Sequence, residues 1–286
     1  LQHELTYNYK TYLQQLGYSK SSINMLPACV LGFLQYTNTT EPKEISQEQI
    51  ISYCEYLQNR PHKRKPTALS ESFIHHNIYS LKVFFNWLEQ TRQLEYNPIS
   101  NLKFKRPKAN TREPLSKEEI IQLFEAAKNS KEIAILHLFY SCGLRRTEAE
   151  NLNTSDIHFT QNLLYVREGK GAKRRVIPIT EKVKKELQHY FTTERKTNAA
   201  KDLEAFMFNT KYARMKGDQY NKTLKQILQR TEIEQEITLH HLRHSIATHL
   251  LENGLPIEFV RDFLGHTHLE ATQIYAKVVD RQLKKL

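Results

Sequence analysis

Residues 156–179 read DIHFTQNLLYVREGKGAKRRVIPI, and this stretch interrupts a chain whose other patterns are mostly helical. The apolar side chains nearest the centre of this stretch include Leu164, Val166, Val176 and Ile177. A polar gap at residues 169–174, with glycine and basic side chains, separates the first pair from the second. Alternation on both sides of such a gap predicts two antiparallel strands joined by a basic turn. We therefore expect a mainly α fold with a small antiparallel β-sheet in its second half.

Helical patterns flank this predicted hairpin on both sides. Upstream, Ser116 precedes a periodic run and Glu119 follows three residues later, which is the spacing of a capping box. Helices are expected from there to about Leu152. Downstream, helical periods return at about Glu181, and residues 206–208 form a further candidate strand.

The first hundred residues show helical signals alone. One helix is expected after Ser19, and a second begins at Ser46, where Gln49 completes a capping box. A long apolar stripe over residues 70–94 predicts a third helix with one buried face. We expect residues 1–102 to form an all-helical first domain.

Residues 103–114, KFKRPKANTREP, separate the two halves. Two prolines and several basic side chains are typical of an interdomain linker. The linker is either a solvated connector or a strand that lies along a phosphate backbone, and the basic residues expected to contact DNA are Lys103, Lys105, Arg106 and Lys108. Residues 115–286 are expected to form the second domain.

The charge balance points to a polyanionic partner. Lysine and arginine number 42 against 31 acidic residues, which gives a formal charge of +11 and a pI near 9.4. Nucleic acid is the commonest partner of such a chain. A membrane-surface protein is the rival, but no basic amphipathic helix with large apolar anchors supports it. No apolar run long enough for a membrane span and no apolar leader is seen, so a cytoplasmic protein is expected.

Cysteine usage excludes two site classes. Cys29, Cys54 and Cys142 are odd in number and far apart, without a CxxC pair. Neither a disulfide framework nor a zinc ribbon is indicated, and the three are expected to be small buried side chains.

Two basic segments of the second half are candidates for anion chemistry. Gly143 precedes Arg145, which is expected at a helix start, where a guanidinium can hold a phosphate while Glu148 braces it. A surface ion pair is the alternative. The turn around Lys170 lacks the GxxxxGK[ST] pattern of a nucleotide-binding loop. It is either an exposed basic turn or a hairpin tip whose lysine donates a proton.

Two further segments lie near the end of the sequence. His240 and Arg243 fall on one helix face, and an arginine there suits an anionic oxygen better than a metal ion. The zincin pattern HExxH is absent, so no metal site is expected. His241, His244 and His249 are expected to serve packing or the surface. Eight residues separate His266 from Tyr275, and taken singly that tyrosine would count as an ordinary core or surface residue.

Taken together, these segments supply what metal-free phosphodiester transfer needs. Two arginines can neutralise the non-bridging oxygens of the transition state. A phenol can attack and keep the phosphate as an ester, while a lysine and a histidine move the protons.

The four segments resemble those of the tyrosine recombinase (phage integrase) family, most of all its Xer-type and transposon integrases. The resemblance implies a helical core-binding (SAM-like) domain followed by an α+β catalytic domain. It also implies a role for each site residue. Arg145 and Arg243 bind the scissile phosphate, Lys170 is the general acid, His240 assists proton transfer, His266 hydrogen-bonds the phosphate, Glu148 orients its neighbours, and Tyr275 forms a 3′-phosphotyrosyl link. Lys173 and Arg175 of the hairpin are expected DNA contacts.

The resemblance further implies a site-specific recombinase that works without metal, ATP or any other cofactor. Its partners would be double-stranded recombination sites, on which a homotetramer exchanges strands through a Holliday junction. Without DNA it would be a monomer or weak oligomer, and in the cell it would lie at the nucleoid. Two rivals remain: a type IB topoisomerase-like enzyme that relaxes DNA, and a non-catalytic DNA-binding accessory protein.

Overall fold

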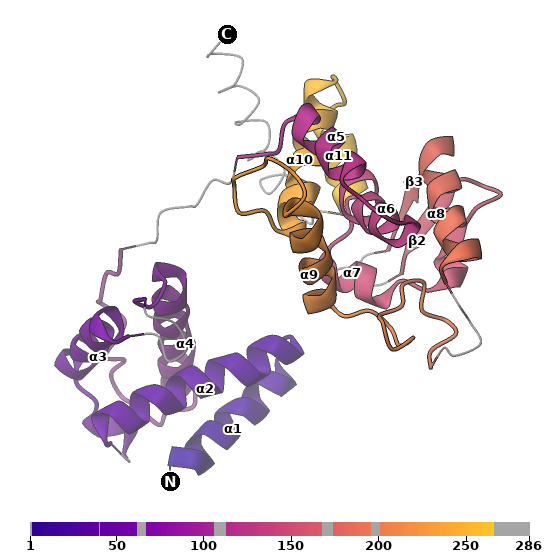
Figure 1. Cartoon of the computed structure of the whole chain (residues 1–286). Helices are drawn as coiled ribbons and strands as arrows, with labels where there is room; N and C mark the ends of the chain where they lie inside the picture. The colour runs from indigo at the N-terminus through magenta and orange to yellow at the C-terminus, as the bar shows by residue number, and fades with distance from the viewer. Residues whose placement is uncertain are drawn as a thin grey trace. The chain divides into compact units, whose positions relative to one another are not determined.

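The computed structural model describes residues 2–39, 41–61, 67–105, 113–167, 174–195 and 201–265. The chain divides into two compact units, residues 1–110 and 111–286 (Figure 1). The expected fold class is confirmed, because the described residues are mainly helical and carry one small antiparallel sheet in the second unit.

The first unit is built from α-helices. Their bounds are α1 Gln2–Gln15, α2 Lys20–Thr37, α3 Gln47–Asn59 and α4 Glu71–Gln90, with a 3-10 turn, η1, at Pro42–Glu44. The expected capping box is confirmed at the start of α3, where Ser46 Oγ accepts from Gln49 N–H and the Gln49 side chain accepts from Ser46 N–H. The helix expected over residues 70–94 ends earlier, at Gln90, since Arg92 adopts a left-handed backbone (φ 57°). Leu94 is still buried, which explains why the apolar stripe runs past the helix end.

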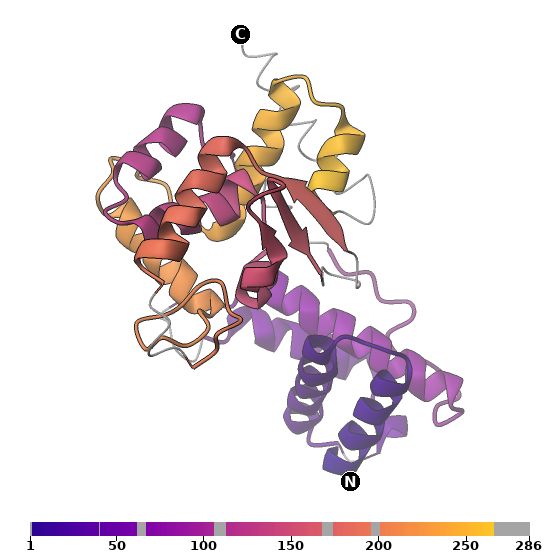
Figure 2. The same ribbon diagram turned by 90° about the vertical axis from the view of Figure 1, so that its right-hand side faces the viewer.

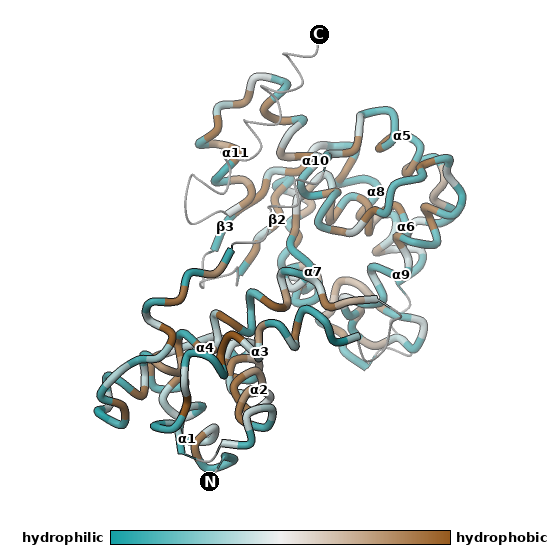
Figure 3. The backbone as a smooth tube through the Cα atoms, turned by 90° about the vertical axis from the view of Figure 1, so that its left-hand side faces the viewer, coloured by the Kyte–Doolittle hydropathy of each residue, from teal (hydrophilic) through white to brown (hydrophobic). Residues whose placement is uncertain are grey.

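The core of the first unit is rich in aromatic side chains. Tyr9 of α1 is fully buried and packs edge-on against Phe84 of α4 at 5.3 Å between ring centres. Phe33 of α2 packs in the same way against Tyr53 of α3. Figure 3 shows hydrophobic and hydrophilic residues alternating along these helices, as expected for elements with one buried face.

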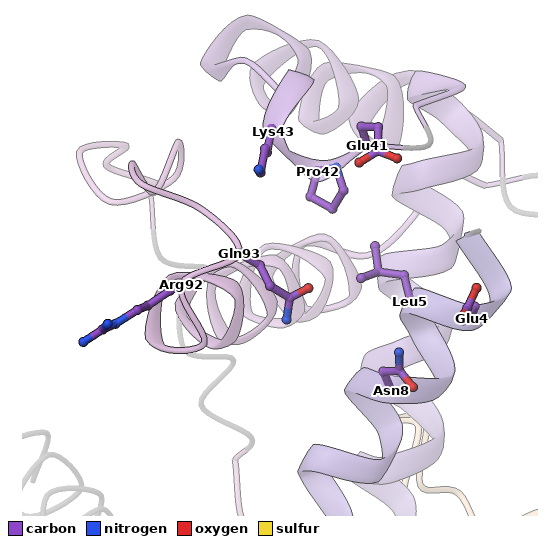
Figure 4. Close-up of a pocket in the computed structure, with 8 residues that line it drawn as sticks. All are labelled: Glu4, Leu5, Asn8, Glu41, Pro42, Lys43, Arg92 and Gln93. Atoms are coloured by element: carbon purple, nitrogen blue, oxygen red, sulfur yellow. The ribbon is translucent and has the colours of Figure 1, made fainter.

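The first unit also has a surface pocket of about 480 Å³. Glu4 of α1, Glu41 before η1 and Arg92 after α4 are among the residues that line it (Figure 4). None of the residues expected to act in catalysis lines this pocket.

The second unit combines helices with the sheet. Its helices are α5 Lys117–Glu125, α6 Ser130–Leu136, α7 Arg146–Asn151, α8 Glu181–Thr193, α9 Gly217–Leu228, α10 Leu239–Glu252 and α11 Ile257–Leu264. A π-helical turn, η2 His137–Ser141, extends α6, and a 3-10 turn, η3 Thr154–Asp156, precedes the sheet. The capping box expected at Ser116 and Glu119 is confirmed at the start of α5. No described helix of either unit has the length and apolar character that a bilayer crossing requires.

The sheet contains the strands β1 Ile157–His158, β2 Leu163–Val166 and β3 Arg175–Pro178 in antiparallel order β1-β2-β3 (Figure 2). In the register of β2 against β3, Val166 pairs with Arg175 and Leu164 pairs with Ile177. Since paired residues share a face, Arg175 lies on the same face as buried Leu164 and Ile177. Helix α11 packs beside β3.

The candidate strand at residues 206–208 is not a strand in the structure. Phe208 forms an isolated bridge with Arg214, and Ala205 forms one with Asn153. The segment is apolar and buried because it packs into the core, but its backbone pairs with two different partners instead of one continuous neighbour.

Candidate active site

Arg145 stands at the beginning of a helix, as expected. It is the N-cap residue of α7, and its side chain is about one-fifth exposed. Gly143, two residues earlier, has a left-handed backbone (φ 56°) that turns the chain from η2 into α7. The glycine turn therefore presents Arg145 at the N-terminus of a helix.

The buried carboxylate of Glu148 joins three arginines. Arg145 donates to it twice, from Nη1 at 2.7 Å and from its backbone N–H at 2.8 Å. Arg175 donates twice as well, from Nη1 to Oε1 at 2.8 Å and from Nη2 to Oε2 at 2.7 Å. Arg243 Nη1 lies 3.9 Å from Oε2, which is within ion-pair distance but beyond a hydrogen bond. Glu148 is thus the common partner of side chains from the N-cap of α7, from β3 and from α10.

This surrounding sets the charge state of Glu148. Burial on its own raises the pKa of the carboxyl group, but the hydrogen bonds and charges of Arg175, followed by those of Arg145, outweigh it. The resulting pKa is about 2. The carboxylate is therefore ionised at neutral pH and offsets part of the positive charge around it.

The C-terminal end of α11 provides a second set of acceptors. Three consecutive carbonyl groups there each accept a hydrogen bond from a different one of the three arginines. The pairs are Arg175 Nε to Phe263 O at 2.9 Å, Arg243 Nη2 to Leu264 O at 2.5 Å, and Arg145 Nη2 to Gly265 O at 2.8 Å. The last carbonyls of a helix have no partners within the helix and carry its negative dipole end. Arginine side chains stabilise this end of α11, directly before His266 in the sequence.

Arg243 is the most deeply buried of the three arginines, with 1% exposure. Its Nη1 also donates to the carbonyl of Gly143. The carbonyl of Gly143 therefore connects this turn to α10 by a hydrogen bond. Because glycine has no Cβ, α11 can pack closely against the same turn. A Cβ at Gly143 would lie 3.0 Å from the Phe263 ring and 3.2 Å from Leu264.

His240 and Arg243 both lie near the N-terminus of α10, three residues apart. His240 is exposed, whereas Arg243 is buried. The other histidines of the helix are buried. His241 Nδ1 accepts a hydrogen bond from Thr238 N–H at 3.0 Å, and His249 Nδ1 is paired with Tyr140 Oη at 2.9 Å.

Arg175 lies in a different place from the one expected of a DNA contact. Its side chain is 7% exposed, and its donors point to Glu148 and Phe263 instead of solvent. The sequence contained the signal for this position, because Arg175 is two residues from apolar Ile177 and strand alternation puts both on one face. The neighbouring Arg174 is exposed.

The described residues place only part of the expected site. Lys103 and Lys105 are exposed, and Phe104 between them packs against the core of the first unit. The expected site residues that lie outside the described residues are Arg106, Lys108, Lys170, Lys173, His266 and Tyr275. The structure thus brings together Arg145, Glu148, Arg175 and Arg243.

Two pockets on the second unit border this group. One of about 220 Å³ is lined by Glu148 and by Tyr165 and Arg167 of the sheet region. The other, of about 550 Å³, includes Arg167, Arg174 and Arg175 in its lining. Arg167 is exposed and paired with Asp156. Arg167 was not among the expected site residues, although it lies two residues before the basic turn at residues 169–174.

Comparison with known proteins gives consistent matches across the chain. Residues 113–282 match the family model described as "Phage integrase family", and residues 5–95 match "Phage integrase, N-terminal SAM-like domain". A tyrosine recombinase of Pseudothermotoga lettingae is 33% identical over 248 residues, covering 86% of this chain and 82% of the relative. Tyrosine recombinase XerA of Pyrococcus horikoshii is 30% identical over 281 residues, covering 97% and 90%.

Solved structures show the same likeness. The crystal structure of XerA recombinase matches with a TM-score of 0.56 and 26% identity, covering all of this chain and 98% of the other. A lambda integrase dimer bound to a core site matches with a TM-score of 0.75 and 16% identity, covering 96% and 94%. At that identity the second match is a likeness of fold.

Proposed function

Because the chain belongs to the phage integrase family of tyrosine recombinases, it is a site-specific recombinase, and we propose that it cuts and rejoins DNA through Tyr275. The observation that carries this proposal is the cluster of Arg145, Arg243 and Arg175 around one buried carboxylate, Glu148. Three guanidinium groups against one carboxylate leave a net positive charge. Such a site stabilises the negative charge that develops on the phosphate oxygens in the transition state of transfer.

The proposed cleavage step needs one phosphate and no cofactor. The phenolic oxygen of Tyr275 forms a bond to phosphorus as the bond from phosphorus to the 5′ oxygen breaks. His240 receives the phenolic proton, and Lys170 gives a proton to the departing 5′ oxygen. His266 hydrogen-bonds a phosphate oxygen, while Arg145 and Arg243 neutralise its charge. The product is a 3′-phosphotyrosyl ester and a free 5′ hydroxyl.

Rejoining is the same step in reverse. The ester conserves the energy of the broken phosphodiester bond, so an incoming 5′ hydroxyl can displace Tyr275 without nucleotide hydrolysis. Attack by the hydroxyl of a different strand exchanges partners and produces a Holliday junction. We place this reaction in a homotetramer on two recombination sites, at the nucleoid in the cytoplasm. The family of relatives favours this activity over relaxation by a type IB topoisomerase-like enzyme and over a non-catalytic accessory role.

The DNA contacts are proposed on charge and exposure. Lys103 and Lys105 are exposed at the end of the first unit, and Arg106 and Lys108 follow them in sequence. Lys173 of the hairpin is a further proposed contact. Cationic side chains of this kind bind the phosphate backbone and are expected to supply affinity instead of sequence recognition.

A suicide substrate tests the nucleophile. A recombination site nicked next to the cleavage position loses a short fragment after attack, so the covalent complex accumulates and is seen as a shifted band in a denaturing gel. The wild type is expected to form it. Tyr275→Phe should form none while keeping its DNA affinity, and Tyr7→Phe, an exposed tyrosine of α1, serves as the control. An adduct formed by Tyr275→Phe would refute the assignment.

A further inference from the structure

We infer that Arg175 is a positioning residue for cleavage, which acts through Glu148 and the end of α11 and does not contact DNA. The inference rests on the proposed function, because it assigns a role within the same site. It starts from the bonding capacity of one carboxylate.

The carboxylate of Glu148 has about four lone-pair positions for hydrogen bonds. Arg175 occupies two of them, and the side chain and backbone of Arg145 occupy the other two. Arg243 therefore stays at 3.9 Å from the carboxylate, and its Nη atoms bind the carbonyls of Gly143 and Leu264 instead. Arg175 saturates Glu148 and so keeps the carboxylate from drawing Arg243 away from a bound phosphate.

Loss of Arg175 would leave Glu148 with two outcomes, and each harms the site. The carboxylate can turn towards Arg243 and pair with it directly. Alternatively it can take up a proton, because burial raises the pKa of the carboxyl group and Arg175 provides the largest opposing effect. The first outcome displaces a phosphate-binding arginine, and the second removes the partner that orients Arg145.

Arg175 also holds the chain that leads to His266. Its Nε donates to the carbonyl of Phe263, the first of the three consecutive acceptors. Its side chain fills the space beside Gly265, where an added Cβ would lie 3.0 Å from Arg175 Cδ. One guanidinium therefore links β3 to the carboxylate of α7 and to the last turn of α11.

The orientation of β3 separates this role from DNA binding. Arg175 pairs with Val166 on the inner face of the sheet, while the adjacent Arg174 is exposed. All three nitrogen atoms of the Arg175 guanidinium donate to Glu148 or Phe263, and we infer that these contacts, and not a phosphate, hold the side chain. Arg174 is therefore the matched control for charge and location.

The experiment measures single-turnover cleavage of the nicked substrate by full-length Arg175→Lys, Arg175→Met and Arg174→Met at saturating protein. Arg175→Met is expected to lower the cleavage rate constant by roughly 100-fold or more, and Arg175→Lys by roughly tenfold, because one ammonium cannot span both carboxylate oxygens. DNA affinity should change less than about twofold for either variant, with the salt dependence of binding unchanged. Arg174→Met should keep the wild-type cleavage rate.

Two further measurements distinguish positioning from a merely structural role. In Arg175→Met the acid side of the pH–rate profile should move up by about one unit or more, since Glu148 then takes up a proton more easily. In a Glu148→Gln background, Arg175→Met should have a smaller effect than in the wild type, because the contact with Glu148 is already weakened and mainly the contact with the end of α11 remains to be lost. Thermal unfolding shows whether each variant is folded, and Arg175→Lys provides the comparison if Arg175→Met is not.

Opposite results would overturn the inference. Normal cleavage of bound DNA with weakened, less salt-dependent binding would identify Arg175 as a phosphate contact. Additive losses in the double variant, or an unmoved pH profile, would show that it does not act through Glu148. The proposed function is judged separately, by adduct formation in the wild type and its loss in Tyr275→Phe.

Discussion

Gly143 and Phe263 lie in such close contact that a Cβ on Gly143 would come within 3.0 Å of the Phe263 ring. The two residues are 120 positions apart, and the contact brings the turn before Arg145 against the last turn of α11. The same turn gives its carbonyl to Arg243. The packing of a small residue thus fixes where the arginines meet the helix end.

Gly143→Ala is expected to destabilise the protein and to slow cleavage. The left-handed backbone costs an alanine about 1 kcal/mol, and the contact with Phe263 adds about 1–3 kcal/mol of overpacking. Gly254→Ala is the control, because Gly254 also has a positive φ (83°) but nothing within 4 Å of the added atom. Denaturant unfolding and single-turnover cleavage measure both effects. Equal losses in the two variants would show that the contact with α11 has no influence.

Glu148→Gln is expected to reveal the stability that the ionised carboxylate provides. Its pKa is lowered from 4.5 to about 2, so this stabilisation is complete above about pH 4.5 and is lost as the pH falls towards 2. The shift corresponds to a contribution on the order of 3 kcal/mol. The variant should therefore be less stable than the wild type near neutral pH, and the gap should narrow in acid. Denaturant unfolding at about pH 7 and about pH 3 checks this; a gap independent of pH would contradict it.

Lys103→Gln and Lys105→Gln are expected to weaken DNA binding mainly at low salt. Each phosphate contact that is lost should reduce the slope of log affinity against log salt concentration by about 0.9. Lys182→Gln, an exposed lysine of α8, is the control. Binding titrations over a range of salt concentrations give the slopes. If the slopes of all three variants match the wild type, residues 103–105 are a connector and not a phosphate contact.

Arg195→Gln is expected to destabilise the second unit without a direct effect on cleavage. Arg195 is buried, donates to the carbonyls of Leu203 and Ala205, and lies 4.5 Å from the centre of the Phe208 ring. Loss of these charged hydrogen bonds should cost about 2–4 kcal/mol. Arg195→Lys should recover only part of the loss, because a lysine cannot make the same set of bonds. Thermal unfolding ranks the stabilities of the wild type, Arg195→Lys and Arg195→Gln, in that expected order. An Arg195→Lys variant as stable as the wild type would contradict the prediction.

Local signals predicted much of the fold. The capping boxes at Ser46 and Ser116 depend on side chains three residues apart, so the sequence alone contains all that is needed to place these helix starts. The strands around the basic turn were predicted in the same way, from alternation. The end of α4 was not, because Leu94 is buried outside the helix and continues its apolar stripe. The π-helical turn at His137–Ser141 had no local signal.

The sequence predicted which residues belong to the candidate site, but it predicted their contacts less well. Arg145 and Glu148 are three residues apart, so their contact followed from helix geometry. Contacts between Glu148 and Arg175, or between Arg243 and Leu264, depend on how distant elements pack. Arg175 was expected to contact DNA, and the structure places its side chain, 7% exposed, against Glu148 and the carbonyl of Phe263.

The span of the arginine cluster has a consequence for protein synthesis. The arginines and the carbonyls that accept from them extend from Gly143 to Gly265, and Tyr275 lies further along the chain. A nascent chain on the ribosome folds its early segments first. The helical first unit can therefore fold while the arginine cluster of the second unit does not yet exist. Premature termination before Gly265 yields a chain without the complete cluster, and under the proposed function such a product would not cleave DNA.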